Sequence, residues 1–75
     1  MEFENSGVGR CVILKDSDIG YTLIYSIRRN QFIVVSDLDK DTGSWLHGRY
    51  FDEDLDSALS FFNDRTQEKA EEYER

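Results

Sequence analysis

Hydrophobic and polar side chains alternate most regularly between residues 21 and 28. One face of this segment would carry Tyr21, Leu23, Tyr25 and Ile27, and the other Thr22, Ser26 and Arg28, with Ile24 as the single exception. A period of two predicts a β-strand with one buried face. Residues 11–15 and 32–35 are short apolar runs, and residues 44–51 alternate again, so the sequence predicts three or four strands.

Residues 32–35 are apolar at every position, and the run leads to Leu38. Because successive side chains of a strand point to opposite faces, this strand would be buried on both faces. One helix can cover only one face of a sheet. We therefore expect the second face, which would carry Phe32 and Val34, to be covered by a second copy of the chain or by another partner. A homodimer is one form of this expectation.

Polar segments separate the predicted strands. Residues 16–20 and 39–43 combine Asp, Ser or Thr with a glycine, which is typical of turns. Asn30 makes a tight reversal plausible after residues 21–28, because asparagine tolerates the left-handed backbone region. Residues 1–7 are mostly polar, and we expect them to fray.

From Asp52 onward the hydrophobic period becomes 3.6 residues, which predicts a helix over residues 52–75. Its apolar stripe consists of Leu55, Ala58, Leu59 and Phe62, with Phe61 beside it. Asp52 or Asp54 is a suitable N-cap, because its carboxylate can accept hydrogen bonds from the free N–H groups of the first turn. A helix of this length exceeds the strands, so its last one or two turns should extend past the sheet.

Together these elements predict an α+β fold in one domain, residues 1–75. An antiparallel three- or four-stranded β-meander over residues 8–51 precedes one C-terminal amphipathic α-helix, which packs on one sheet face. A chain of 75 residues is too short for a second domain. The helix side of the core should contain the four stripe residues. The sheet side should contain Leu23, Ile27, Ile33, Val35 and either Leu46 or Trp45.

Composition narrows the biochemical class. Cys11 is the only cysteine, so no intramolecular disulfide is possible, and with His47 as the only histidine a Cys/His zinc site is excluded. The chain has no apolar run of the roughly 20 residues that a membrane span needs, and its acidic start does not resemble a signal peptide. We expect a cytoplasmic protein without a cofactor.

The net charge of −7 is distributed unevenly. Residues 1–50 contain seven acidic and six basic side chains, whereas residues 51–75 contain nine acidic and three basic ones. The predicted helix therefore carries most of the negative charge. Either this is a solvated face that keeps the protein soluble, or it attracts a basic partner by imitating the charge line of a nucleic-acid backbone.

Two patterns suggest chemistry and have simpler explanations. Asp37, Asp39 and Asp41 occupy alternate positions, as the first ligands of a calcium-binding loop do. That loop also needs a glycine at its sixth position and a bidentate glutamate at its twelfth, and here these positions hold Thr42 and Gly48. A solvated turn therefore explains the stretch better. Cys11 and His47 are the only nucleophile and base that could pair, but no pattern brings them together. We expect no catalytic residues.

Basic and aromatic side chains on the sheet leave a nucleic-acid alternative open. The candidates are Lys15, Arg28, Arg29 and Arg49, with Tyr21, Tyr25, Trp45 and Tyr50. The alternation places Tyr25 and Arg28 on opposite faces, and the net charge would repel a polyanion.

The segment 43–51 has the form G-x-W-x-x-G-x-Y-F, and residues 55–61 have the form L-x-x-A-x-x-F. These roughly 20 residues resemble small uncharacterised proteins of bacterial phages, plasmids and conjugative elements, in which such a strand precedes such a helix. The resemblance implies a β-meander with a helix and an origin in a mobile element. Acidic proteins of that origin are sometimes inhibitors of host nucleases or repressors. It implies no activity and no site residue.

The sequence thus favours a non-enzymatic protein-interaction module, an acidic inhibitor or regulator that binds a basic, nucleic-acid-binding partner. A single-stranded nucleic-acid-binding domain is the alternative, and a small enzyme or enzyme subunit is the third class. The residues expected to contact the partner are Trp45, Tyr50, Asp52, Asp54, Glu68, Glu71 and Glu72.

Overall fold

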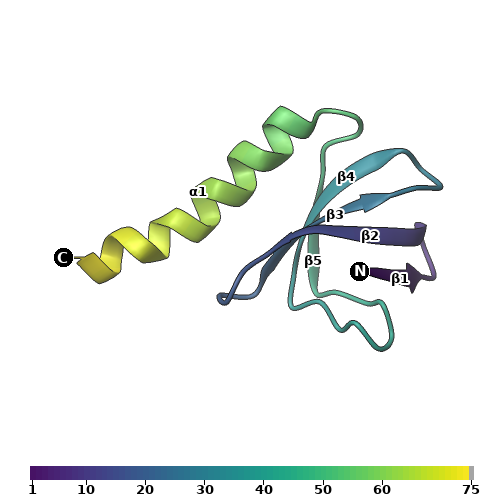
Figure 1. Ribbon diagram of the computed structural model, residues 1–75, viewed down its shortest axis with the longest axis horizontal. Helices are drawn as coiled ribbons and strands as arrows, with labels where there is room; N and C mark the ends of the chain where they lie inside the picture. Colours follow the sequence, from purple (N-terminus) through teal and green to yellow (C-terminus); the bar gives the residue numbers. More distant parts are fainter. Residues whose placement is uncertain (75) are drawn as a thin grey trace.

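The computed structural model describes residues 1–74, and within them the side chains of residues 1–66. It consists of one five-stranded antiparallel sheet and one helix (Figure 1). In chain order the elements are β1 (Glu2–Asn5), β2 (Gly9–Asp16), β3 (Tyr21–Ser26), β4 (Gln31–Ser36), β5 (His47–Tyr50) and α1 (Leu55–Glu74). Each strand pairs with the next, so the sheet is a meander, and α1 contacts β3 and β4. The predicted α+β class and the helix packed on the sheet are confirmed.

The N-terminal residues form an additional strand, so the expectation that residues 1–7 fray was wrong for residues 2–5. β1 pairs with the start of β2, and Phe3 lies opposite Cys11. Phe3 is buried, whereas the flanking Glu2 and Glu4 are exposed. One apolar residue between two acidic ones is too short a pattern to predict a strand, and the pairing with β2 supplies the missing stabilisation.

The last strand is shorter than the alternation of residues 44–51 predicts. β5 contains only residues 47–50, and Trp45 and Leu46 belong to the loop between β4 and β5. This loop is closed by an isolated bridge between Asp39 and Ser44. The loop folds back over the sheet, so Trp45 reaches the core from outside the strand.

The two faces of the sheet carry two separate cores. On the helix side, Leu23 and Val34 pack against Ala58 and Phe62 of α1, with Phe32 and Leu59 at the periphery. We call the opposite set the inner cluster, which consists of Phe3, Val8, Cys11, Ile24, Ile33 and Val35.

The predicted assignment of β4 side chains to the two faces was therefore wrong. Val34 and Phe32 lie under the helix, and Ile33 and Val35 lie on the far side. Other expected core positions are on the surface, since Ile27 is 50% exposed and Leu46 is 67% exposed. A continuous apolar run contains no polar residue to mark its outer face, so its pattern alone could not assign the helix side.

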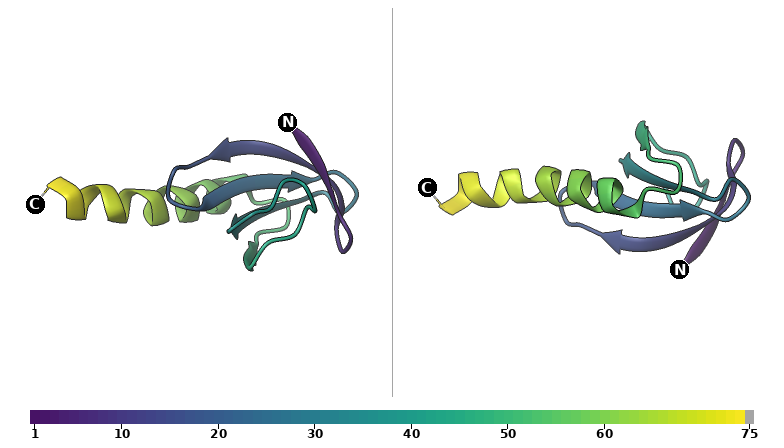
Figure 2. Two further views of the ribbon diagram at one scale, coloured as in Figure 1. Left: turned by 90° about the horizontal axis from the view of Figure 1, so that it is seen from below. Right: turned by 90° about the horizontal axis from the view of Figure 1, so that it is seen from above.

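Both faces of β4 are buried as predicted, but the chain itself covers the second one. Leu38 and Trp45 of the β4–β5 loop pack against the inner cluster, and Asn5 Nδ2 donates a 2.7 Å hydrogen bond to the carbonyl of Gly43. The sheet curves so that this loop reaches β1 (Figures 1 and 2). Within residues 1–66, the second face of β4 is thus covered by the chain itself and leaves no open apolar face for a second copy to cover.

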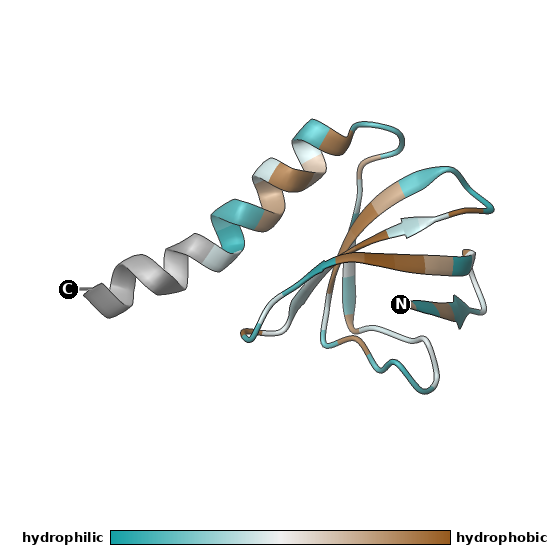
Figure 3. Cartoon of the chain, in the orientation of Figure 1, coloured by the Kyte–Doolittle hydropathy of each residue, from teal (hydrophilic) through white to brown (hydrophobic). Residues whose placement is uncertain are grey.

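Asp54 is the N-cap of α1. Its carboxylate accepts hydrogen bonds from the backbone N–H of Ser57 at 3.0 Å and from the Ser57 hydroxyl at 2.6 Å. These bonds lower the pKa of Asp54. The first turns of α1 carry the apolar residues that pack on the sheet (Figure 3), and the helix continues past the edge of the sheet (Figure 1).

Asp16 links the end of β2 to the β4–β5 loop. Its carboxylate accepts hydrogen bonds from Lys40 Nζ at 3.0 Å and Thr22 Oγ1 at 2.9 Å. The hydrogen bond from Lys40, followed by those from Thr22 and the Ser17 backbone, lowers the pKa of Asp16 below 3.8. Because the pKa is lower in the folded state, the ionised carboxylate stabilises the fold at any pH above the pKa of the unfolded state. This contribution is lost as the pH falls through the folded-state pKa.

We therefore predict that Asp16→Asn reduces the free energy of unfolding at neutral pH by no more than about 1 kcal/mol, because the pair is half exposed. The difference in the free energy of unfolding between this variant and wild type should become smaller near pH 3. Urea unfolding at the two pH values measures both quantities. Asp18→Asn, which removes a carboxylate of the same turn, controls for net charge. A difference that grows in acid would contradict the prediction.

Candidate functional site

A row of four side chains crosses the helix side of the sheet, one from each of β2 to β5. The strand register aligns Lys15 with Leu23, Leu23 with Val34, and Val34 with Arg49. Because α1 lies over the two apolar members in the middle, the two cations flank the helix. Lys15 Nζ lies 5.9 Å from the centroid of the Phe62 ring, and Arg49 Cζ lies 5.3 Å from that of Phe61.

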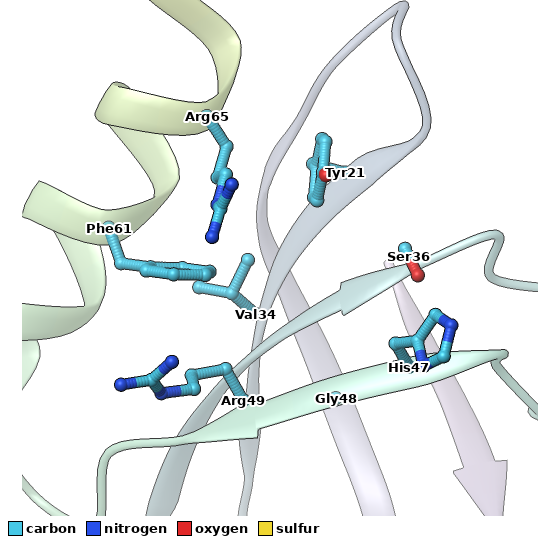
Figure 4. Close-up of a pocket in the computed structure, with 8 residues that line it drawn as sticks. All are labelled: Tyr21, Val34, Ser36, His47, Gly48, Arg49, Phe61 and Arg65. Atoms are coloured by element: carbon cyan, nitrogen blue, oxygen red, sulfur yellow. The ribbon is translucent and has the colours of Figure 1, made fainter.

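On the β5 side of this row, a cavity of about 310 Å³ opens between α1 and the sheet. We call it the cationic pocket, and it is lined by Tyr21, Val34, Ser36, His47, Gly48, Arg49, Phe61 and Arg65 (Figure 4). A second register row places Tyr21 opposite Ser36, and Ser36 opposite His47. Arg65 approaches from the helix, and its Cζ lies 4.8 Å from the centroid of the Phe61 ring.

Among residues 1–66, whose side chains the structure describes, no carboxylate lines the cationic pocket, although the chain has a net charge of −7. Two guanidinium groups, an imidazole and two hydroxyls supply hydrogen-bond donors. Val34 and Phe61 form an apolar part of the pocket wall. Such a set of groups can bind an anion, and it contains no nucleophile paired with a base.

A second concave surface lies near the start of α1. This apolar groove, about 450 Å³ in volume, is lined by Leu14, Tyr25, Asn30, Phe32, Glu53 and Leu55. Leu14 and Leu55 are 44% and 39% exposed, and the rings of Tyr25 and Phe32 are in contact with their centroids 4.9 Å apart. Asn30 Nδ2 donates a 2.6 Å hydrogen bond to Glu53, which fixes one acidic side chain at the edge of the groove.

The predicted partner-contacting residues do not form one surface. Tyr50 is 50% exposed on β5, whereas Trp45 is half-buried against the inner cluster. The Asp52 carboxylate accepts a 3.1 Å hydrogen bond from Gln31, and Asp54 caps the helix. The remaining three, Glu68, Glu71 and Glu72, lie outside the described side chains.

The three alternating aspartates form a loop and not a ligand set. Asp39 accepts a hydrogen bond from the backbone N–H of Asp41 at 2.9 Å, which is the side-chain geometry of an Asx turn. Asp37 takes a left-handed backbone conformation with φ of 55°. Within the described residues, no three His, Cys, Asp or Glu side chains lie close enough to hold a metal ion.

Cys11 and His47 lie on opposite faces of the sheet. Cys11 is fully buried in the inner cluster, and this burial raises the pKa of its thiol. His47 lines the cationic pocket on the helix side. The two side chains therefore cannot act as a nucleophile and its base.

The basic and aromatic residues proposed for nucleic acid are only partly brought together. Arg49 and Tyr21 share the cationic pocket, but Arg28 and Arg29 lie in the turn after β3, at the opposite end of that strand from Tyr21. Arg65 and His47 complete the pocket and were not among the candidates. The strand register and the helix placement, which bring these groups together, cannot be read from local spacing.

Comparisons with protein-family models, curated proteins and solved structures found no match. The resemblance to proteins of mobile elements therefore stays a prediction. No helix within residues 1–74 combines the length and apolar composition that crossing a membrane requires.

Proposed function

We propose that this chain is a non-enzymatic protein-interaction module that binds a basic partner through the apolar groove and the acidic start of α1. The observation that carries the proposal is that the acidic start of α1 lies directly beside the apolar groove. Glu53 lines the groove, and Asp52, Asp54 and Asp56 are its neighbours in the chain. An apolar groove bordered by negative charges is complementary to a partner surface on which apolar and basic side chains lie next to each other.

The groove can provide most of the binding free energy. Leu14 and Leu55 leave apolar surface in water, and the contacting rings of Tyr25 and Phe32 add aromatic surface to the same groove. Side chains that fill such a depression lose water on both partners, which is typical of binding hot spots. Tyr50, although half exposed on β5, lies opposite Ile33 and therefore on the other face of the sheet, so the proposed interface does not include it.

The acidic residues provide attraction and selectivity. All four carboxylates at positions 52, 53, 54 and 56 are exposed, and Asp54 has a lowered pKa, so it remains ionised at neutral pH. Exposed charges steer a partner of opposite sign and are screened by salt. In this proposal the further acidic residues of α1 extend the same field, and the partner is a nucleic-acid-binding protein in the cytoplasm that the module inhibits or regulates.

Two charge-reversal variants with equal net charge test the proposal. The first carries Asp52→Lys, Glu53→Lys and Asp56→Lys, and the control carries Asp18→Lys, Asp37→Lys and Asp41→Lys on exposed turns. Each tagged protein is used to capture proteins from nuclease-treated lysate of its own organism, and the captured proteins are quantified. A basic protein retained by wild type should be lost about tenfold with the first variant and retained within about twofold by the control.

The salt dependence gives a second readout. Retention by wild type should fall steeply as salt increases, and residual retention by the first variant should depend on salt much less. Equal losses with both variants would show that only net charge matters, and would refute a defined interface. Recovery that disappears on nuclease treatment would favour the single-stranded nucleic-acid-binding alternative.

A further inference from the structure

We propose that the cationic pocket is a binding site for the phosphate group of a small phosphorylated molecule. This inference is independent of the proposed function, because the pocket lies on the β5 side of α1 and shares no lining residue with the apolar groove.

The donors of the pocket come from four elements. Tyr21 of β3, Ser36 of β4 and His47 of β5 are consecutive neighbours across the sheet, so their side chains form one polar row on the helix side. Arg65 of α1 extends toward the cavity from above this row (Figure 4). Within the described side chains, none of these four forms a side-chain hydrogen bond or an ion pair. No side chain of residues 1–66 therefore competes with a ligand for these donors.

Phe61 organises the positive charge of the pocket. Its ring contacts the guanidinium groups of both Arg49 and Arg65, which in Figure 4 reach it from below and from above. A guanidinium over an aromatic face is held by the ring quadrupole and keeps its in-plane N–H groups free. The ring thus holds the guanidinium groups of Arg49 and Arg65 beside the cavity.

The arrangement fits a phosphate better than a carboxylate. Donors from a helix and three strands surround the cavity, which suits the three terminal oxygens of a tetrahedral phosphate monoester. A planar carboxylate is matched best by donors in one plane, as in a bidentate pair with a single arginine. The cavity of about 310 Å³ is larger than one phosphate, and Val34 and Phe61 offer apolar contact to an organic group.

An NMR titration of the full chain with phenyl phosphate at constant ionic strength tests the inference. The backbone amide signals of Ser36, Gly48 and Phe61 should shift and saturate. Arg65→Gln should weaken binding by about tenfold, because it removes a charge-assisted hydrogen bond. Arg28→Gln removes one guanidinium from the turn after β3 and should change the affinity by no more than about twofold. Ser36→Ala provides a second, uncharged test from the sheet side and should also weaken binding.

Several results would overturn the inference. They are shifts that do not saturate, equal weakening by Arg65→Gln and Arg28→Gln, and binding of benzoate as tight as that of phenyl phosphate, which would assign the pocket to carboxylates. Tighter saturation of the same amides by a single-stranded oligonucleotide would assign it to nucleic acid.

Discussion

Gly43→Ala is expected to lower the free energy of unfolding by about 3 kcal/mol or more, through backbone strain and steric overlap together. Gly43 has a φ of 78°, where a side chain is disfavoured, and a Cβ there would lie 1.8 Å from the carbonyl oxygen of Glu4. That oxygen belongs to β1, so relief requires the β4–β5 loop and β1 to separate. The separation would also break the hydrogen bond from Asn5 to Gly43.

Gly20→Ala is the matched control, because it isolates the backbone contribution. Gly20 has a φ of 93°, but the nearest atom to its added Cβ is 3.6 Å away. We expect this variant to cost only about 1 kcal/mol. Urea unfolding monitored by circular dichroism compares the two. A loss for Gly43→Ala no larger than for Gly20→Ala would show that the loop can shift without releasing β1.

Phe62→Ala should lower the free energy of unfolding by about 3–5 kcal/mol, which is a large part of the stability of a domain of this size. Phe62 is 3% exposed and packs with Ala58 against Leu23 and Val34. Truncation would leave a cavity in the smaller of the two cores, and few other apolar residues hold α1 on the sheet. Chemical denaturation, followed by the helical signal, gives the magnitude.

Leu46→Ala is the control for this prediction. Leu46 is also a large apolar residue, but it is 67% exposed, so its truncation should change the stability by no more than about 0.5 kcal/mol. A small effect of Phe62→Ala, similar to that of Leu46→Ala, would mean that α1 does not depend on this contact.

The position of α1 connects the core with both proposed sites. The helix provides Leu55 to the apolar groove and Phe61 and Arg65 to the cationic pocket. Phe62 belongs to neither site. It faces the sheet and fixes the rotation of the helix about its axis. Weakening this contact should therefore impair both of the proposed binding activities, whereas Gly43→Ala acts on the opposite face of the sheet.

Local sequence patterns determined the elements with regular periods. The alternation from residue 21 onward marks β3, the 3.6-residue period marks the start of α1, and Asn30 takes the left-handed conformation expected of its turn, with φ of 56°. Asp54 is one of the two predicted N-caps. These features depend on neighbours within a few residues, so they can be read directly along the chain.

Tertiary structure decided the faces, the extra strand and the two concave surfaces. An apolar run such as that of β4 is compatible with either orientation, and only the packing of α1 places Val34 beneath the helix and Ile33 in the inner cluster. β1 becomes a strand because the curved sheet brings it against β2 and the β4–β5 loop. The cationic pocket joins residues from Tyr21 to Arg65 through strand register. Such contacts form between distant segments, so their energies are absent from any local pattern.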